Sequence, residues 1–177
     1  NTTNVSDKEY ILKIYGNDTA TNIKFESRFA ITDNTTPAIR LDTENDTWSD
    51  SIANTLTFAV FETNNLNNCT LIINGSINAT LTSLTKNSTN TFRLNASDGV
   101  YRWNVNCSDE AVDTNGERNY GVNSTDYIFS VDTIKPQISF AIPATETNDS
   151  HFARNYTAIN ITITEANFAN VTFSLYN

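Results

Sequence analysis

Residues 101–107 read Tyr-Arg-Trp-Asn-Val-Asn-Cys, and apolar side chains alternate with polar ones through the stretch. Successive side chains of a β-strand point to opposite faces of the sheet, so Tyr101, Trp103, Val105 and Cys107 share one face. A strand with one apolar and one polar face covers a core on one side and meets water on the other. The stretch therefore predicts an antiparallel sheet with one buried face.

The composition of the whole chain favours the same fold class. Its 177 residues include 27 Asn, 27 Thr and 14 Ser, whereas Met is absent and charged residues make up 18%. Asn, Thr and Ser favour turns, caps or strands over helix interiors. Ten Phe, seven Tyr and two Trp supply enough apolar surface for a core, which argues against disorder. We expect a folded all-β protein.

Charge and hydropathy narrow the classes of partner. The chain has a net charge of -9, with 20 acidic against 11 basic residues, so it offers nucleic acid or an anionic membrane no electrostatic attraction. No run approaches the roughly 18 apolar residues that span a bilayer. The first residues include neither an initiator Met nor a signal peptide, which indicates a mature product or an internal segment. We expect no nucleic-acid partner and no membrane span.

Acceptor motifs for N-linked glycan, Asn-x-Ser/Thr with x not Pro, occur sixteen times in the chain. About six would arise by chance in this composition. The acceptor residues are Asn1, Asn4, Asn17, Asn34, Asn45, Asn68, Asn74, Asn78, Asn87, Asn95, Asn106, Asn123, Asn148, Asn155, Asn160 and Asn170. The alternative is that Asn and Thr only line solvent-facing strand positions. The enrichment favours a glycoprotein and an extracellular or cell-surface location.

The chain repeats itself with a period of about one hundred residues. The matched segments are 4–14 with 95–105, 35–39 with 134–138, 58–62 with 161–165 and 66–71 with 168–173, at offsets of 91, 99, 103 and 102. A fixed period of this kind indicates tandem structural modules. Residues 37–133 then form one complete module. Residues 1–36 match the last strands of a module, and residues 134–177 match the first three strands of another.

The complete module contains seven short strand patterns separated by polar turns. They lie at 38–41, 55–61, 69–74, 79–84, 91–95, 100–107 and 125–131. Seven strands in about a hundred residues predict a Greek-key β-sandwich of two packed sheets. The predicted core consists of Ile39, Leu56, Phe58, Val60, Leu71, Ile73, Leu94, Tyr101, Trp103, Val105, Tyr127, Phe129 and Val131.

Three segments carry a resemblance to a known family. They are Asn-Cys-Thr-Leu at 68–71, Ser-Asp-Gly-Val-Tyr-Arg-Trp-Asn-Val-Asn-Cys-Ser-Asp at 97–109, and Val-Asp-Thr-Ile-Lys-Pro at 131–136. The chain resembles in them the immunoglobulin-like tandem repeats of large archaeal cell-surface and S-layer-type proteins. The resemblance covers nearly the whole chain and implies immunoglobulin-like sandwich repeats. Such sandwiches serve as spacers, adhesins and lattice walls alike.

The resemblance also implies a disulfide between the two cysteines. In an immunoglobulin-like sandwich the strand that begins at Cys69 and the strand that ends at Cys107 are antiparallel neighbours. Their counterparts in the other copies are Val171 and Gly16, so both cysteines are missing together, which supports a pair. Two free thiols or a metal pair are the alternatives. A zinc site would need further ligands, and His151 is the sole histidine of the sequence.

The chain offers no catalytic constellation of nucleophile, base and orienting group, so we expect no enzyme. Carboxylates gather in polar loops at Asp42, Glu44 and Asp46 and at 109–117. In the second loop, Asp109, Glu110, Asp113, Asn115 and Glu117 lack the alternating order of a calcium loop. We expect no metal and no cofactor apart from glycan, with calcium at this loop as an alternative.

These features predict a structural, heavily N-glycosylated extracellular surface or filament protein. The alternative function is an adhesin or carbohydrate-binding module with surface glycans as partners, for which Trp48 is the one candidate aromatic platform. Neither partial module can close a sandwich by itself. The first exposes Tyr10, Leu12, Ile14, Ile23 and Phe25, and the last exposes Ile138, Phe140, Ile142, Ile159, Ile161, Ile163, Val171, Phe173 and Leu175. We expect donor-strand complementation between copies joined head-to-tail, or else a segment of a longer array completed in cis.

Overall fold

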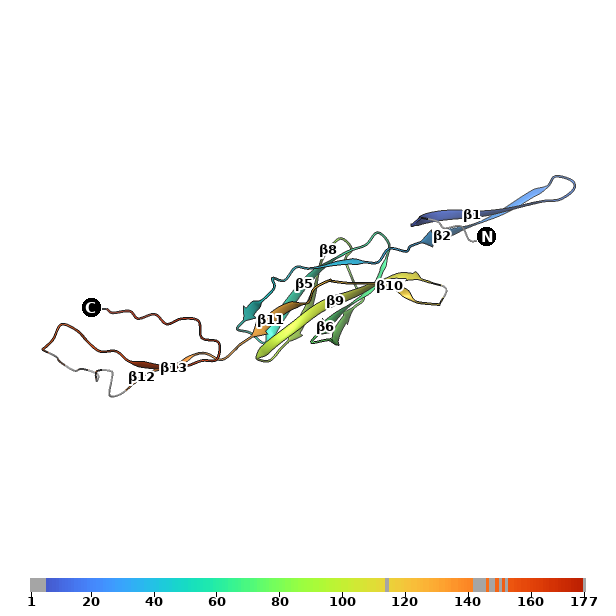
Figure 1. The fold of residues 1–177 in the computed structure, drawn as a ribbon. Helices are drawn as coiled ribbons and strands as arrows, with labels where there is room; N and C mark the ends of the chain where they lie inside the picture. Colours follow the sequence, from blue (N-terminus) through green and yellow to red (C-terminus); the bar gives the residue numbers. More distant parts are fainter. Residues whose placement is uncertain are drawn as a thin grey trace. The chain divides into compact units, whose positions relative to one another are not determined.

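A computed structural model of the chain describes residues 6–113, 115–141, 146, 149, 151 and 153–176. The helices and strands of these residues are all β-strands, with no helix among them, which confirms the predicted all-β class (Figure 1). The chain divides into two compact units, Asn1–Asp132 and Thr133–Asn177. The described residues hold no helix with the length and apolar character needed to cross a membrane.

The first unit begins with a hairpin of β1 (Lys8–Asn17) and β2 (Ile23–Thr32), which pair over ten residues as a separate two-stranded sheet. Asp18 closes the turn, because its Oδ1 accepts hydrogen bonds from the backbone amides of Ala20 and Asn22, each at 2.9 Å. Hydrogen bonds from the side chain and backbone of Asn22 hold the pKa of Asp18 below its ordinary value.

The remaining strands of the first unit form two sheets, and residues 37–132 are referred to below as the central module. One sheet has the strand order β3 (Ala38–Leu41), β5 (Ala53–Phe61), β8 (Ser88–Asn95). The other has the order β4 (Thr47–Ser49), β11 (Tyr127–Val131), β9 (Gly99–Val112), β6 (Leu66–Ile73), β7 (Ser76–Leu81), and β10 (Arg118–Val122) also pairs with β9. The β4–β11 pair is parallel and the other pairs are antiparallel.

Each of the seven predicted strand patterns overlaps an observed strand of the central module, and β4 and β10 are additional. β9 extends five residues beyond its predicted end at 107, and β7 is displaced by three residues at both ends, because it spans Ser76–Leu81 rather than 79–84. Asn74 and Gly75 adopt positive φ angles of 50° and 77°, so they form a tight hairpin turn directly after β6. Because this turn is so short, β7 begins to pair with β6 at Ser76, three residues before the start that the side-chain pattern predicts.

Apolar side chains from both sheets of the central module form one buried cluster. Phe58 and Phe92 of the three-stranded sheet stack with ring centroids 5.2 Å apart. Trp103 and Tyr127 of the other sheet meet edge to face at 6.2 Å. All thirteen predicted core residues are in this cluster or pack directly against it. The prediction of the core is therefore confirmed, with Phe92 as its main omission.

The second unit contains β12 (Gln137–Phe140) and β13 (Ile161–Thr164), an antiparallel pair of four residues each. Residues 166–176 carry no strand assignment, so the prediction of a third strand here is wrong. By sequence this segment copies β6, which lies between β7 and β9 in the central module. The described residues of the second unit contain no counterpart of β7 or β9, so the segment lacks strands on which to pair.

Candidate functional site

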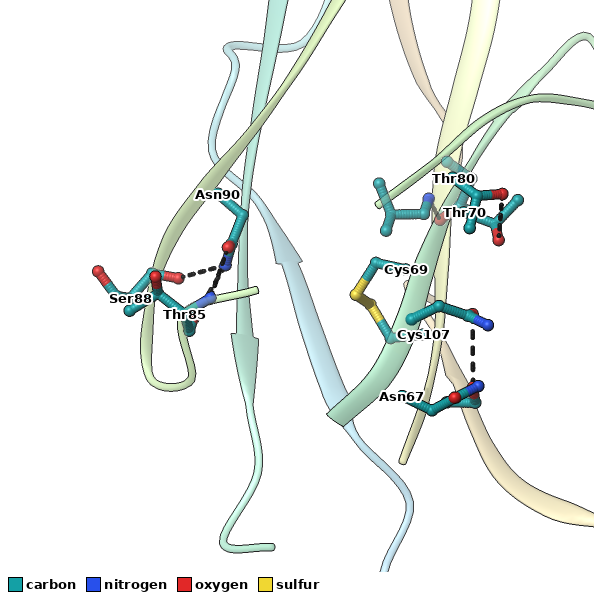
Figure 2. Close-up of a disulfide and its surroundings, with 12 residues drawn as sticks. Asn67, Cys69, Thr70, Thr80, Thr85, Ser88, Asn90 and Cys107 are labelled. Atoms are coloured by element: carbon teal, nitrogen blue, oxygen red, sulfur yellow. Dashed lines mark hydrogen bonds between the residues drawn. A yellow bond between two sulfur atoms is a disulfide. The ribbon is translucent and has the colours of Figure 1, made fainter. Parts of the chain in front are cut away.

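The two cysteines form a disulfide inside one sheet. Cys69 of β6 and Cys107 of β9 are direct cross-strand partners, and both are fully buried (Figure 2). The hydroxyls of Thr70 and Thr80 face each other at 3.3 Å across the neighbouring β6–β7 pair. The predicted disulfide is confirmed, and free thiols or a metal pair at these cysteines are excluded.

Both two-stranded sheets repeat strand pairs of the central module in the same register. At the offsets found in the sequence, the pairs of β12–β13 correspond to pairs of β3–β5, and the pairs of β1–β2 correspond to pairs of β9–β11. The matching pairs are Ile138–Ile163 with Ile39–Val60, Phe140–Ile161 with Leu41–Phe58, Tyr10–Ala30 with Tyr101–Phe129, and Leu12–Arg28 with Trp103–Tyr127. The sequence repeat is therefore also a repeat of strand pairing.

A tyrosine hydrogen bond recurs at matching positions near the start of β1 and of β9. The hydroxyl of Tyr101 donates to the backbone carbonyl of Ser97 at 2.8 Å. The hydroxyl of Tyr10 donates in the same way to the carbonyl of Ser6 at 3.0 Å. Each bond connects the start of a strand to the residues that precede it. No pattern described above predicted these bonds. The shared four-residue spacing of Ser and Tyr was the available signal.

The β1–β2 hairpin carries apolar side chains on both of its faces, although Lys24, Glu26 and Arg28 of β2 share one face with those of β1. Tyr10, Leu12 and Ile14 alternate along β1 on the face that corresponds to the buried face of β9. The cross-strand pairs place Ile23 and Phe25 on the opposite face, so the five predicted exposed residues are divided between two faces. The opposite face is the more apolar. Its large apolar side chains, all of them exposed, are those of Ile11, Tyr15, Ile23, Phe25, Phe29 and Ile31. The sequence pattern identified these residues but not their division.

The second unit has an open apolar groove of about 410 Å³. Its apolar lining consists of Ile138, Phe140, Ile159, Ile161, Val171, Phe173 and Leu175. Phe173 is 58% exposed, whereas its counterpart in the central module, Leu71, is 0% exposed. In the central module β9 pairs with β6 beside Leu71 and contributes Trp103 and Val105 to the core. Among the described residues of the second unit, the groove has no counterpart of the β9–β11 pair that covers the matching residues of the central module. Ile142, also predicted to be exposed here, lies outside the described residues.

Most of the described glycan acceptor residues are open to solvent. Asn1, Asn4 and Asn148 lie outside the described residues, and of the remaining thirteen, ten are exposed. The three half-buried acceptors are Asn68, Asn106 and Asn123. The side-chain amide of Asn123 donates a hydrogen bond to the carbonyl of Thr125 at 2.6 Å, so the nitrogen to which a glycan would be attached already has a partner. The described surface therefore offers sites for dense glycosylation.

The carboxylates of the loop considered for calcium make separate contacts. Asp113 accepts hydrogen bonds from the backbone amides of Glu117 at 2.9 Å and Asn115 at 2.8 Å, which lower its pKa. Asp109 is buried and accepts a hydrogen bond from the Asn119 side chain at 3.0 Å. Asp113 therefore uses its carboxylate to close its own turn.

Other singled-out residues occupy the surface. Trp48 of β4 is 56% exposed, and His151 is exposed as well. Asp42 forms an ion pair with the guanidinium of Arg40, with Nε and Oδ1 2.6 Å apart. Comparisons of the chain with protein-family models, curated proteins and solved structures give no match.

Proposed function

We propose that the chain is a structural, N-glycosylated component of an extracellular surface or filament, built from immunoglobulin-like modules like those of archaeal cell-surface and S-layer-type proteins. The strand order of the central module supports this assignment. A sheet of β3, β5 and β8 faces one that contains β11, β9 and β6, and Tyr101 forms a hydrogen bond resembling the tyrosine corner of such domains. The disulfide departs from the antibody pattern, because it joins neighbouring strands of one sheet.

In this proposal, copies join head-to-tail by strand complementation. The observation that carries it is the shared register: β1–β2 copies β9–β11, and the described part of the second unit, which holds the groove, contains no counterpart of that pair. Leu12 and Ile14, the counterparts of Trp103 and Val105, would enter the groove beside Phe173. A second copy is the occupant, because the first unit carries the complementary hairpin with its apolar side chains exposed.

Sedimentation and electron microscopy of three variants test this association. Leu12→Asp/Ile14→Asp alters the hairpin, and Phe173→Asp alters the groove. Each variant is expected to stop chain growth, because a buried unpaired carboxylate disfavours docking. A mixture of the two is expected to give dimers only, since each retains one intact surface. The control is Ile77→Asp, which changes an exposed residue of the central module and should associate as the wild type does.

A wild-type chain that stays monomeric at high concentration would overturn the head-to-tail assembly, as would unaltered association of the hairpin and groove variants. Glycosylation is tested separately by the intact mass of protein from its native source before and after glycan removal. The expected result is a mass loss of many glycans, with attachment sites among the exposed acceptors. An unchanged mass would refute glycosylation while leaving the assembly test valid.

One observation favours the adhesin as a second candidate function. Trp48 presents an exposed aromatic side chain on β4, which is the kind of platform that sugars stack on. Specific binding on a glycan array that is lost in Trp48→Ala and kept in Tyr120→Ala, a change at another exposed aromatic residue, would support it. The absence of specific binding by the wild type would eliminate it.

A further inference from the structure

Residues 168–176 of the second unit have the side-chain alternation of a strand without its backbone pairing. Polar and apolar side chains alternate here in the order Asn170, Val171, Thr172, Phe173, Ser174 and Leu175. Within the described part of the chain, residues 168–176 form no backbone hydrogen bonds with another segment. All of them are exposed. Their backbone donors and acceptors are therefore available to a partner strand.

Strand β1 offers a matching open edge. Among the described residues β1 pairs with β2 alone, over ten residues, in a two-stranded sheet. Its counterpart in the central module, β9, pairs with β11 along one edge and with β6 along the other. The open edge of β1 therefore corresponds to the edge of β9 that β6 occupies. A long open strand edge is a template for the addition of another strand.

The repeat also specifies the register of such an addition. Segment 168–176 is the sequence counterpart of β6 at an offset of 102, and β1 is the counterpart of β9 at an offset of 91. The pairs across β6 and β9 include Cys69–Cys107, Leu71–Val105 and Ile73–Trp103. The corresponding pairs are Val171–Gly16, Phe173–Ile14 and Leu175–Leu12. In this register the apolar side chains of both segments lie on one face, which is the core face of the central module.

The side-chain sizes in these corresponding pairs compensate one another. Phe173 and Ile14 together are larger than the pair that they replace, whereas Leu175 and Leu12 together are smaller. At the position of the disulfide, a branched side chain stands opposite Gly16. A Cβ atom at Gly16 would have no atom within 4 Å, so this position has room for a bulky partner. The total volume of the six side chains is nearly kept, and cores tolerate exchanges of this kind best.

We propose that residues 168–176 form a strand on the open edge of β1 of a second copy, antiparallel and in the register Val171–Gly16, Phe173–Ile14 and Leu175–Leu12. This inference rests on the head-to-tail association proposed above and adds backbone pairing to it. The joined sheet has the order β2, β1, 168–176, like the order β11, β9, β6 of the central module. A second copy is the partner, because the chain itself carries the strand that the register requires.

Cysteine cross-linking between two chains tests the register. Under mild oxidation, a Gly16→Cys chain mixed with a Val171→Cys chain is expected to form a disulfide-linked dimer, because the counterparts of these positions form a disulfide. The native cysteines are fully buried and serve as an intact reference. The control replaces Val171→Cys by Thr172→Cys, which places the thiol on the opposite face, and should lower the yield about tenfold. Mass spectrometry of the linked peptides measures the yield.

Hydrogen exchange separates strand pairing from docking of side chains alone. Amides within 168–176 are expected to exchange about tenfold more slowly in assembled wild type than in Leu12→Asp/Ile14→Asp, which keeps this segment but has an altered hairpin. Amides of β6 in the central module are the internal control and should exchange equally in both proteins.

Two results would overturn the strand pairing while leaving the head-to-tail association valid. One is equal cross-linking through positions 171 and 172, or no cross-link at either, in chains that still associate. The other is fast amide exchange within 168–176 in the assembled protein. A wild-type chain that stays monomeric would overturn both the association and the pairing, so the two proposals fail in distinguishable ways.

Discussion

Cys69 and Cys107 stand directly opposite each other on neighbouring strands, with their Cα atoms 4.0 Å apart. The bond links β6 to β9 in the middle of the larger sheet and closes a loop with a sequence separation of 38 residues. Constraining such a loop in the unfolded chain is worth about 4 kcal/mol by loop-closure arithmetic. The disulfide is therefore expected to be a major contributor to the stability of the central module.

Replacing both cysteines, as Cys69→Ala/Cys107→Ala, is expected to lower the free energy of unfolding of the central module by about 4 kcal/mol. Equilibrium denaturation with urea measures the change. Wild-type protein treated with reductant serves as the control for packing lost with the sulfur atoms, and it should lose a similar amount. A double variant as stable as the oxidised wild type would contradict this role.

Truncation of the two tryptophans is expected to change stability by very different amounts. Trp103 is 1% exposed and contacts Tyr127, so Trp103→Ala is expected to lower the unfolding free energy by about 3 to 5 kcal/mol. Trp48→Ala changes an exposed side chain and is expected to alter stability by less than about 0.5 kcal/mol. Circular dichroism during denaturation distinguishes the two, and equal losses would show that the core is placed incorrectly.

Removing the hydroxyl of Tyr101 tests the hydrogen bond to Ser97. Tyr101→Phe keeps the ring stacked on Phe129 but leaves the carbonyl of Ser97 without this donor, which is expected to lower stability by about 1 kcal/mol. Tyr10→Phe is the matched control, because its hydroxyl makes the corresponding bond in the hairpin. The control should leave unfolding of the central module unchanged.

Gly121 of β10 leaves no room for a side chain. A Cβ atom there would lie 1.7 Å from the backbone carbonyl oxygen of Pro37, so Gly121→Ala must displace that backbone. The expected loss of stability is about 1 to 3 kcal/mol, with changed amide shifts around Pro37 in nuclear magnetic resonance spectra. Gly16→Ala, where no atom lies within 4 Å of the added group, is the control and should be nearly neutral.

The turn of the β1–β2 hairpin is expected to respond to acid. The folded pKa of Asp18 lies below its ordinary 3.8, so the carboxylate supports the turn above that value and loses this support as the pH falls through the folded pKa. The amide resonances of Ala20 and Asn22 should follow this titration. In the Asp18→Ala variant these amide resonances should show no such titration. In the Glu9→Ala variant, which alters the same hairpin, the titration should persist.

Local periodicity was sufficient to predict the all-β class and the core. Leu56, Trp103 and Val105 alternate with polar neighbours, and a strand has only two faces, so each pattern determines which side chains are buried. The resemblance to immunoglobulin-like repeats implied the disulfide, and the joint absence of cysteine at the counterparts of Cys69 and Cys107 supported it.

Features that depend on contacts between distant residues required the tertiary structure. β4 is three residues long and has no alternation to detect, and it forms because β11 supplies a parallel partner. The segment 166–176 has a strand pattern but forms no strand, because backbone pairing needs a partner and the described residues of the second unit supply none beside it. Asn119 donates a hydrogen bond to the carbonyl of Asp33, 86 residues away in the sequence, and only folding brings these two residues together. Periodicity determines which way a side chain faces, whereas its neighbours are set by how the strands pair and pack.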